Sequence, residues 1–211
     1  DQSKGYNNVS ATQLADDFNV LYKLAKDQFQ NHQMLVPKVF GPDIAGNIEF
    51  LKSFLLQSKK YGSILNGITV HFYYGNDQVL NTTQDFVDAN VLDKLIPYLG
   101  NVTETVWTYY NPEIAIIIGE TSSTSGGGTK NISTSYVAGF MMLDKLALAS
   151  IYGIYSVARQ EFCGGNYGLI GNGSYSEFLP NPNYWNQYLF KNLVGNKALY
   201  VDGQRNYGRN I

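Results

Sequence analysis

Apolar residues recur at helical spacing along much of the chain. After Ser10, a residue type that commonly caps a helix, Leu14, Phe18, Leu21 and Leu24 follow one another near that spacing. The same spacing returns later, and the pattern predicts helices over residues 10–30, 48–62, 85–106, 133–153 and 184–196. Pro97 lies inside the third of these segments, and we expect that helix to break near it.

Between these helices lie short runs of consecutive apolar and β-branched residues. They cover residues 37–43, 67–74, 112–120 and 154–162, and the strongest contains the sequence IAIIIGE. Unbroken apolar strands that alternate with amphipathic helices indicate a parallel sheet covered by helices. Two α/β architectures fit this order: an open doubly wound sheet, or about half of a (β/α)8 barrel, whose complete form takes roughly 250 residues.

Composition narrows the function classes. Of the 211 residues, 44% are hydrophobic and 15% are charged, which is typical of a globular protein with a core. The formal net charge of −2 provides no basic field, so we expect no nucleic-acid partner. The single cysteine, Cys163, cannot form an internal disulfide, and we expect a buried or half-buried thiol. Without a spaced Cys and His set or a phosphate-binding glycine motif, we expect no metal and no cofactor.

Asn-x-Ser/Thr tripeptides are unusually frequent. They occur at Asn8, Asn81, Asn101, Asn131 and Asn172. Such tripeptides are acceptors of N-linked glycans, so their number favours a secreted, extracellular or lysosomal glycoprotein. The alternative is that an Asn-, Ser- and Thr-rich composition produces them incidentally. The chain opens with the polar sequence DQSKGYNNVS and shows no signal peptide, so we expect a processed or truncated protein.

Polar side chains gather where the predicted strands end. In parallel α/β folds the functional groups lie at the carboxyl ends of the strands. Those ends carry Asp43, His71, Tyr73, Glu120, Arg159, Gln160 and Glu161. Carboxylates among imidazole, phenol and amide groups, without a Ser or Cys nucleophile motif, are typical of enzymes that cleave sugar chains. The alternatives are a solvated loop carboxylate at Glu120, a structural histidine at His71 and a flexible turn at residues 126–128.

Long stretches of the sequence closely resemble heparanase and its relatives, the heparanase-like endo-β-glucuronidases of glycoside hydrolase family 79. The matching runs are GETSSTSGGG, VAGFMMLDKLALAS, ARQEFCGGNYGL, PNPNYW and KNLVGNKAL, and they follow one another in the family's order. The resemblance implies a retaining glycoside hydrolase built on a (β/α)8 barrel. It implies that residues 1–196 are the C-terminal half of this catalytic barrel and that residues 197–211 begin a C-terminal β-sandwich.

The resemblance also assigns site residues. It implies that Glu120 is the catalytic nucleophile and that His71 and Tyr73 lie in the substrate cleft. The other substrate-binding positions that it implies are Gly126 and Gly127, through backbone N–H groups that contact a substrate carboxylate, and Gln160 and Tyr167, which line subsite −1.

The retaining mechanism requires two carboxyl groups roughly 5–5.5 Å apart, one attacking the sugar and one protonating the leaving oxygen. The nucleophile must be ionised, which hydrogen-bond donors favour, and we expect Thr121, Ser122 and His71 to supply them. Glycines 126–128 would let the backbone approach a uronate carboxylate closely.

Two features depart from the family pattern. The family's acid/base glutamate belongs to an N-E-P motif that these 211 residues lack, and we do not expect Glu161 to replace it. We therefore expect a fragment that begins just past the acid, whose partner is the missing N-terminal half of the same protein. Alone, such a half barrel would expose sheet edges, so we expect it to be inactive and prone to aggregate or dimerise.

The second departure concerns the substrate. The stretches GPDIAGNIEF and HFYYGNDQV carry no Arg or Lys where heparanase has sulfate-binding cations. This favours a glycosaminoglycan substrate of low sulfation. The candidates are low-sulfate parts of heparan sulfate, hyaluronan and another glucuronide. A catalytically silent glycan-binding homologue is the alternative from a different function class, and peripheral association with membrane or matrix is left open.

Overall fold

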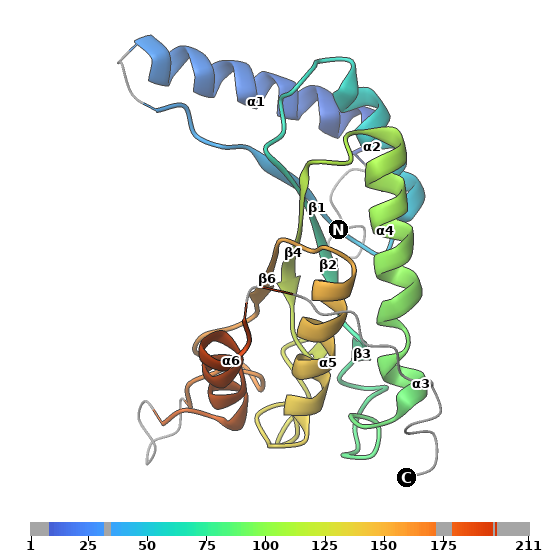
Figure 1. Ribbon diagram of the computed structural model, residues 1–211, viewed down its shortest axis with the longest axis vertical. Coiled ribbons are helices and arrows are strands. Elements are labelled where there is room, and N and C mark those ends of the chain that lie inside the picture. The colour runs from blue at the N-terminus through green and yellow to red at the C-terminus, as the bar shows by residue number, and fades with distance from the viewer. Residues whose placement is uncertain (1–8, 32–34, 172–178, 196, 198–211) are drawn as a thin grey trace. The chain divides into compact units, whose positions relative to one another are not determined.

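The computed structural model describes residues 9–31, 35–171, 179–195 and 197 (Figure 1). The protein is of mixed α/β class with a parallel sheet, as the alternating pattern predicts. The helices are α1 (Ala11–Asn31), α2 (Ile48–Lys59), α3 (Ala89–Leu92), α4 (Leu95–Tyr109), α5 (Ala138–Ile151) and α6 (Pro182–Leu193). The strands are β1 (Phe40–Ala45), β2 (Gly67–Phe72), β3 (Gly75–Asn76), β4 (Ala115–Thr121), β5 (Thr124–Ser125) and β6 (Ser156–Arg159).

The strands of the main sheet are ordered β1-β2-β4-β6. Strands β1 and β2 are parallel, from Phe40 opposite Gly67 to Ala45 opposite His71, with an irregularity between Pro42 and Ile44. The order follows the chain without the reversal that defines a doubly wound sheet, which favours the barrel alternative. A second parallel pair joins β3 to β5.

The chain divides into two compact units. Unit 1 contains residues 1–71, 98–119 and 154–156, and unit 2 contains residues 72–97, 120–153 and 157–211. The boundary crosses β2 after His71 and β4 after Gly119, so the carboxyl ends of both strands belong to unit 2.

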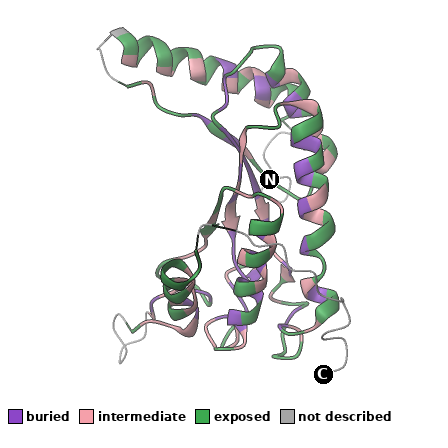
Figure 2. Cartoon of the chain, viewed as in Figure 1, coloured by how far each residue is buried: buried purple, intermediate pink, exposed green. Residues whose placement is uncertain are grey.

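Unit 1 has a continuous apolar core formed by its helices and strands. Leu51, Phe54 and Leu55 of α2 are fully buried in it, and the rings of Phe18 and Phe54 meet edge to face at 5.3 Å. At the edge of this core, the carboxylate of Asp16 accepts a 2.6 Å hydrogen bond from the phenol of Tyr61, which ties α1 to the end of α2. Figure 2 shows the one-sided burial that amphipathic spacing predicts for α4.

Unit 2 is built around α5, whose buried residues repeat at intervals of three or four. They are Ala138, Met141, Met142, Lys145 and Ala149, with Gly139 beside the first. Helix α6 approaches α5 closely at Gly139, because a Cβ added there would lie 2.0 Å from Nδ2 of Asn186. A buried hydroxyl network lies beneath the loop after β4: Ser123 bonds Ser133 at 2.7 Å, and Thr129 bonds the carbonyl of Leu80 at 2.7 Å.

Some predicted boundaries are wrong. The helix expected over 85–106 is interrupted at Asp93 and Lys94, between α3 and α4, and not at Pro97. Pro97 lies in the first turn of α4, where a helix has no internal partner for the missing N–H. The helix expected from residue 133 begins at Ala138, because residues 129–135 form hydrogen-bonded turns.

In the described part of the chain, no helix is both long and apolar enough to span a bilayer. The predicted start of a β-sandwich, residues 197–211, lies outside the described residues except for Lys197. The division at residue 196 therefore stays a prediction.

Candidate active site

Glu120 is the penultimate residue of β4 and lies half-buried in unit 2. Ile116 and Ile118, four and two residues earlier on the same strand, are buried and anchor it. Tyr73 directly follows β2, and its phenol donates a 2.8 Å hydrogen bond to Oε1 of Glu120. The two strand-end residues implied by the family resemblance are therefore paired in the structure.

The phenol of Tyr73 is a permanent donor. Burial raises the pKa of Tyr73 far above its usual range, and the hydrogen bond to Glu120 raises it further. The phenol thus stays protonated near neutral pH, where a carboxylate is ionised. This arrangement supports a carboxylate that acts as a nucleophile.

Tyr167 and Gln160 extend this pair into a network. The phenol of buried Tyr167 lies beside Tyr73 and Gln160, and both side chains influence its pKa. Gln160 is itself fixed, because its backbone N–H donates a 2.8 Å bond to the carbonyl of Thr121. Four of the predicted site residues, Tyr73, Glu120, Gln160 and Tyr167, are thus brought together in unit 2.

Arg159 fixes the backbone of Tyr167. Its guanidinium donates a 2.7 Å bond to the carbonyl of Tyr167. Burial lowers the pKa of Arg159 to about 10, so the side chain is still charged near neutral pH. Burial also raises the pKa of Tyr167, which keeps its phenol neutral.

The glycine loop, residues 126–128, runs beside Tyr167. All three glycines have positive φ angles of 84°, 94° and 88°, a conformation that favours glycine. The loop is held by Asn166, whose backbone N–H bonds the carbonyl of Gly127 at 2.7 Å and whose side chain bonds the carbonyl of Gly128 at 3.0 Å. Of the three glycines, only Gly127 has room for a side chain, because an added Cβ there would meet no atom within 4 Å. At Gly126 an added Cβ would lie 2.7 Å from Asp77, and at Gly128 it would lie 2.7 Å from Tyr167.

His71 belongs to unit 1, where its Nε2 lies 3.2 Å from Oδ1 of Asp43. Asp43 adopts a positive φ of 56°, and its N–H donates to the hydroxyl of Thr69. The same carboxylate lies beside Gly119, where an added Cβ would come within 2.8 Å of it. A role of His71 in substrate binding stays a prediction.

The predicted hydroxyl donors to Glu120 are not found. The hydroxyl of Thr121 donates its proton to the carbonyl of Phe72, and the buried hydroxyl of Ser122 has no hydrogen-bond partner in the part of the chain that the structure describes. The reason is geometric: Thr121 and Ser122 are fully buried, whereas Glu120 is half-exposed. Tyr73 is the donor that sequence reasoning missed.

Glu161, the other strand-end carboxylate, lies against the turn at Gly164 and Gly165, where an added Cβ at Gly165 would approach its Oε1 to 2.6 Å. The expectation that Cys163 is buried is wrong, because the thiol is exposed. Within the described ranges, no three His, Cys, Asp or Glu side chains are grouped to hold a metal ion. Sequence reasoning also missed Asn166, although the run CGGNYG contains it.

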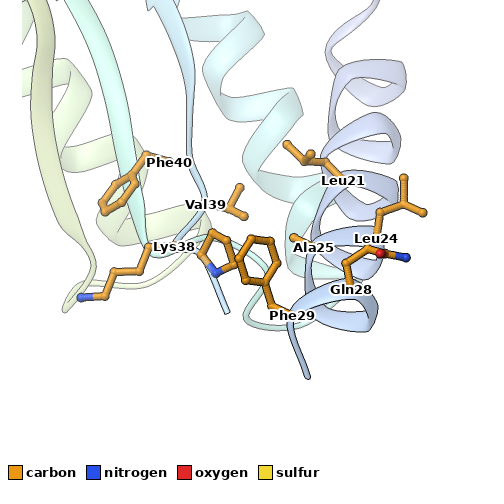
Figure 3. A pocket seen from close by; sticks show the side chains of 9 residues that line it. Leu21, Leu24, Ala25, Gln28, Phe29, Lys38, Val39 and Phe40 are labelled. Atoms are coloured by element: carbon orange, nitrogen blue, oxygen red, sulfur yellow. The ribbon is translucent and has the colours of Figure 1, made fainter. Parts of the chain in front are cut away.

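Of the predicted glycosylation sites, Asn81, Asn101 and Asn131 are exposed. Asn8 and Asn172 lie outside the described residues. Unit 1 also contains an open groove of about 510 Å³ between α1 and the segment before β1 (Figure 3). Leu21, Leu24 and Phe29 line one side of it, and none of the predicted site residues reaches it.

The chain is similar in sequence to several known proteins. The sequence profile described as glycosyl hydrolase family 79, N-terminal domain, matches residues 3–147. The chain is 40% identical to heparanase of Rattus norvegicus over 202 residues, which are 93% of this chain and 35% of that protein. It is 32% identical to hyaluronoglucuronidase of Hirudo nipponia, over 92% of this chain and 38% of that protein. It is also 32% identical to inactive heparanase-2 of Mus musculus, over 85% of this chain and 31% of that protein.

Solved structures agree on the fold. A 4-O-α-L-rhamnosyl-β-D-glucuronidase from Fusarium oxysporum 12S superposes with a TM-score of 0.59 at 17% identity, over 85% of this chain and 37% of that chain. A β-xylosidase from Caulobacter crescentus superposes with a TM-score of 0.61 at 17% identity, over 84% and 37%. The chain spans about a third of the length of the relatives that it matches. The profile match over most of the chain shows that it belongs to glycosyl hydrolase family 79.

Proposed function

We propose that the protein containing this chain is a retaining endo-β-glucuronidase that cleaves glycosaminoglycan chains, with Glu120 as its nucleophile. The observation that carries the proposal is the 2.8 Å hydrogen bond from Tyr73 to Glu120 at adjacent strand ends. A nucleophilic carboxylate is most reactive when it is ionised and held in one orientation. A charge-assisted hydrogen bond favours the ionised form and also fixes the orientation of the carboxylate.

The acid/base partner of Glu120 is proposed to come from outside residues 1–211. The retaining mechanism places the second carboxyl roughly 5–5.5 Å from the first. The sequence has no N-E-P motif, and Glu161 is held against the turn at Gly165. In this proposal the four main strands are about half of a (β/α)8 barrel, whose other half supplies the acid, and residues 197–211 begin a β-sandwich.

The proposed substrate is a glucuronide chain of low sulfation. Gly126 and Gly127 would face the uronate with backbone N–H groups, and Gln160 and Tyr167 would line the subsite of the reacting sugar. No Lys or Arg follows Asp43 before Lys52, and none follows His71 before Lys94. Low-sulfate heparan sulfate and hyaluronan are both candidates, because the chain matches one relative named heparanase and another named hyaluronoglucuronidase.

The test is hydrolysis by the full-length protein, wild type and Glu120→Gln, of heparan sulfate, chemically desulfated heparan sulfate and hyaluronan. The proposal expects chain cleavage that Glu120→Gln abolishes, with desulfated chains or hyaluronan cut faster than highly sulfated ones. Full activity of the Glu120→Gln protein would refute the nucleophile assignment. Preference for the most sulfated chains would refute the substrate proposal alone.

A silent glycan-binding homologue is the second candidate, favoured by the similarity to inactive heparanase-2. Such a protein would bind the same glycosaminoglycans and release no new reducing ends. Binding measured on immobilised chains, beside the hydrolysis assay, separates the two candidates.

We also propose that the protein is a secreted or lysosomal glycoprotein, with peripheral association to matrix or membrane left open. The exposure of Asn81, Asn101 and Asn131 supports this, since a glycan at each would extend into solvent. Glycopeptide mass spectrometry of protein secreted from eukaryotic cells should find glycans at these three sites. Three unmodified asparagines would contradict the proposal.

A further inference from the structure

Lys145 of α5 is a buried lysine to which the proposed function assigns no part in the reaction or in substrate binding. Its exposed fraction is only 1%. Its Nζ donates to the hydroxyl of Thr121 and, at 2.7 Å, to the carbonyl of Ser122. The ring centroids of Tyr74 and Phe72 lie 4.8 and 5.6 Å from the same nitrogen.

These contacts join the two strand ends that carry the Tyr73–Glu120 pair. Thr121 directly follows Glu120, and its hydroxyl donates to the carbonyl of Phe72, which directly precedes Tyr73. A single bridge from Lys145 through Thr121 to Phe72 therefore fixes the backbone next to both members of the pair. All of these residues belong to unit 2.

We propose that Lys145 is a positioning residue for the nucleophile, holding Glu120 and Tyr73 in hydrogen-bonding register through Thr121. The inference rests on the proposed glucuronidase function. An amine suits this place because its several N–H donors serve a hydroxyl and a carbonyl at once, while its remaining surface faces aromatic rings. Lys145 acts through its neighbours and contacts no reacting atom.

Stability does not account for this lysine. Burial lowers the pKa of Lys145, the Arg159 guanidinium lowers it further, and only the Asp144 carboxylate opposes them. Because the folded protein binds this proton less readily than the unfolded chain, burial of Lys145 disfavours folding at neutral pH, and the penalty fades as pH rises toward 10.5. Replacing Lys145 by an apolar side chain removes this penalty but leaves the carbonyl of Ser122 without that donor, so the two effects on stability oppose each other.

The test compares the full-length wild-type protein with Lys145→Met, Thr121→Val, their double variant and Thr121→Ser on a β-glucuronide substrate. Lys145→Met should lower kcat on the order of 10²-fold, the loss typical of a reacting group displaced by about 1 Å. KM should change little, and the melting temperature should change little because the lost desolvation penalty and the lost hydrogen bond to Ser122 oppose each other. Thr121→Val should lose a similar factor, whereas Thr121→Ser, which keeps the hydroxyl, should retain most of kcat.

The double variant shows whether both residues act through one bridge. If they do, it should be no slower than the slower single variant, because residues in one network are not additive. Phe86→Leu is the control: Phe86 is fully buried in unit 2 and lies outside the bridge, so this variant should lower the melting temperature and keep kcat. Losses that multiply in the double variant, or an unchanged kcat in Lys145→Met, would overturn the inference.

Failure of the proposed function gives a different result. An inactive wild-type protein would refute the glucuronidase assignment, and an active Glu120→Gln variant would refute the assignment of Glu120 as nucleophile. The inference would then be decided by a crystal structure of Lys145→Met, in which the separation of Tyr73 Oη and Glu120 Oε1 should grow beyond 2.8 Å. An unchanged separation would overturn it.

Discussion

The phenol of Tyr73 donates a 2.8 Å hydrogen bond to the carboxylate of Glu120, across 47 positions of sequence. Strand β2 ends just before Tyr73 and strand β4 ends just after Glu120, so the sheet itself brings the two side chains together. Burial keeps the pKa of Tyr73 above its usual range, which makes this donor independent of pH near neutrality. The pair is the centre of the proposed glucuronidase site.

Removing the Tyr73 hydroxyl should slow catalysis. A hydrogen bond to a charged group contributes about 1.5–3 kcal/mol, so Tyr73→Phe should lower kcat/KM by roughly tenfold to a hundredfold. Steady-state kinetics of the full-length protein measure this. Tyr110→Phe is the matched control: its half-buried phenol donates to the carbonyl of Gly62 in unit 1, so loss of this hydroxyl should leave kcat/KM unchanged. If the two variants are equally active, the hydrogen bond between Tyr73 and Glu120 does not contribute to catalysis.

Substitutions in the glycine loop should separate backbone strain from displacement of Tyr167. At Gly127 an alanine meets no atom within 4 Å, so its cost is the positive φ alone, about 1–2 kcal/mol of stability. At Gly128 the same methyl group would lie 2.7 Å from the ring of Tyr167, which must then shift from its place beside Tyr73.

Gly128→Ala should therefore lower kcat/KM clearly more than Gly127→Ala, although both lower the melting temperature. Kinetics and thermal unfolding of the two full-length variants check this. A larger kinetic loss at Gly127 would contradict this prediction: it would mean that Tyr167 tolerates displacement and that a methyl group at Gly127 obstructs the uronate proposed to bind there.

Asp85 should make the loop after β3 sensitive to acid. Its carboxylate accepts from the backbone N–H of Thr82 at 2.8 Å and of Asn81 at 3.0 Å, and these bonds lower the pKa of Asp85 below 3.8. A lowered folded-state pKa means that the stabilisation is present above about pH 4 and is lost as pH falls through that pKa. Asp85→Asn should lower the melting temperature at pH 7, and the difference from wild type should shrink toward pH 3. A difference independent of pH would contradict the assigned cause.

The sequence was sufficient to predict the elements that carry the site. The run IAIIIGE predicted a buried strand ending at Glu120, and GITVHFYY predicted another ending near Tyr73; both strands are present. Ser10 was predicted to cap the first helix, and its hydroxyl accepts the N–H of Gln13. These features depend on local spacing, which a sequence displays directly.

Side-chain partners could not be predicted in the same way. The hydroxyl of Thr121 was expected to serve Glu120, but it donates to Phe72, since hydrogen-bond partners depend on which face of the strand is buried. Lys145 would be expected on the surface from its residue type, yet it is fully buried because its amine finds acceptors at Thr121 and Ser122. Such pairings depend on tertiary contacts between residues far apart in the sequence.

In the proposed mechanism, Glu120 attacks the sugar and forms a covalent glycosyl–enzyme intermediate. A 2-fluoro-β-glucuronide with a good leaving group tests it most directly, because fluorine at C2 slows hydrolysis of such an intermediate and lets it accumulate. Peptide mass spectrometry of the inactivated full-length protein should find one glucuronyl group on the peptide that contains Glu120, and none after Glu120→Gln. A label on another carboxylate, or an active protein whose products have inverted anomeric configuration, would contradict the claim.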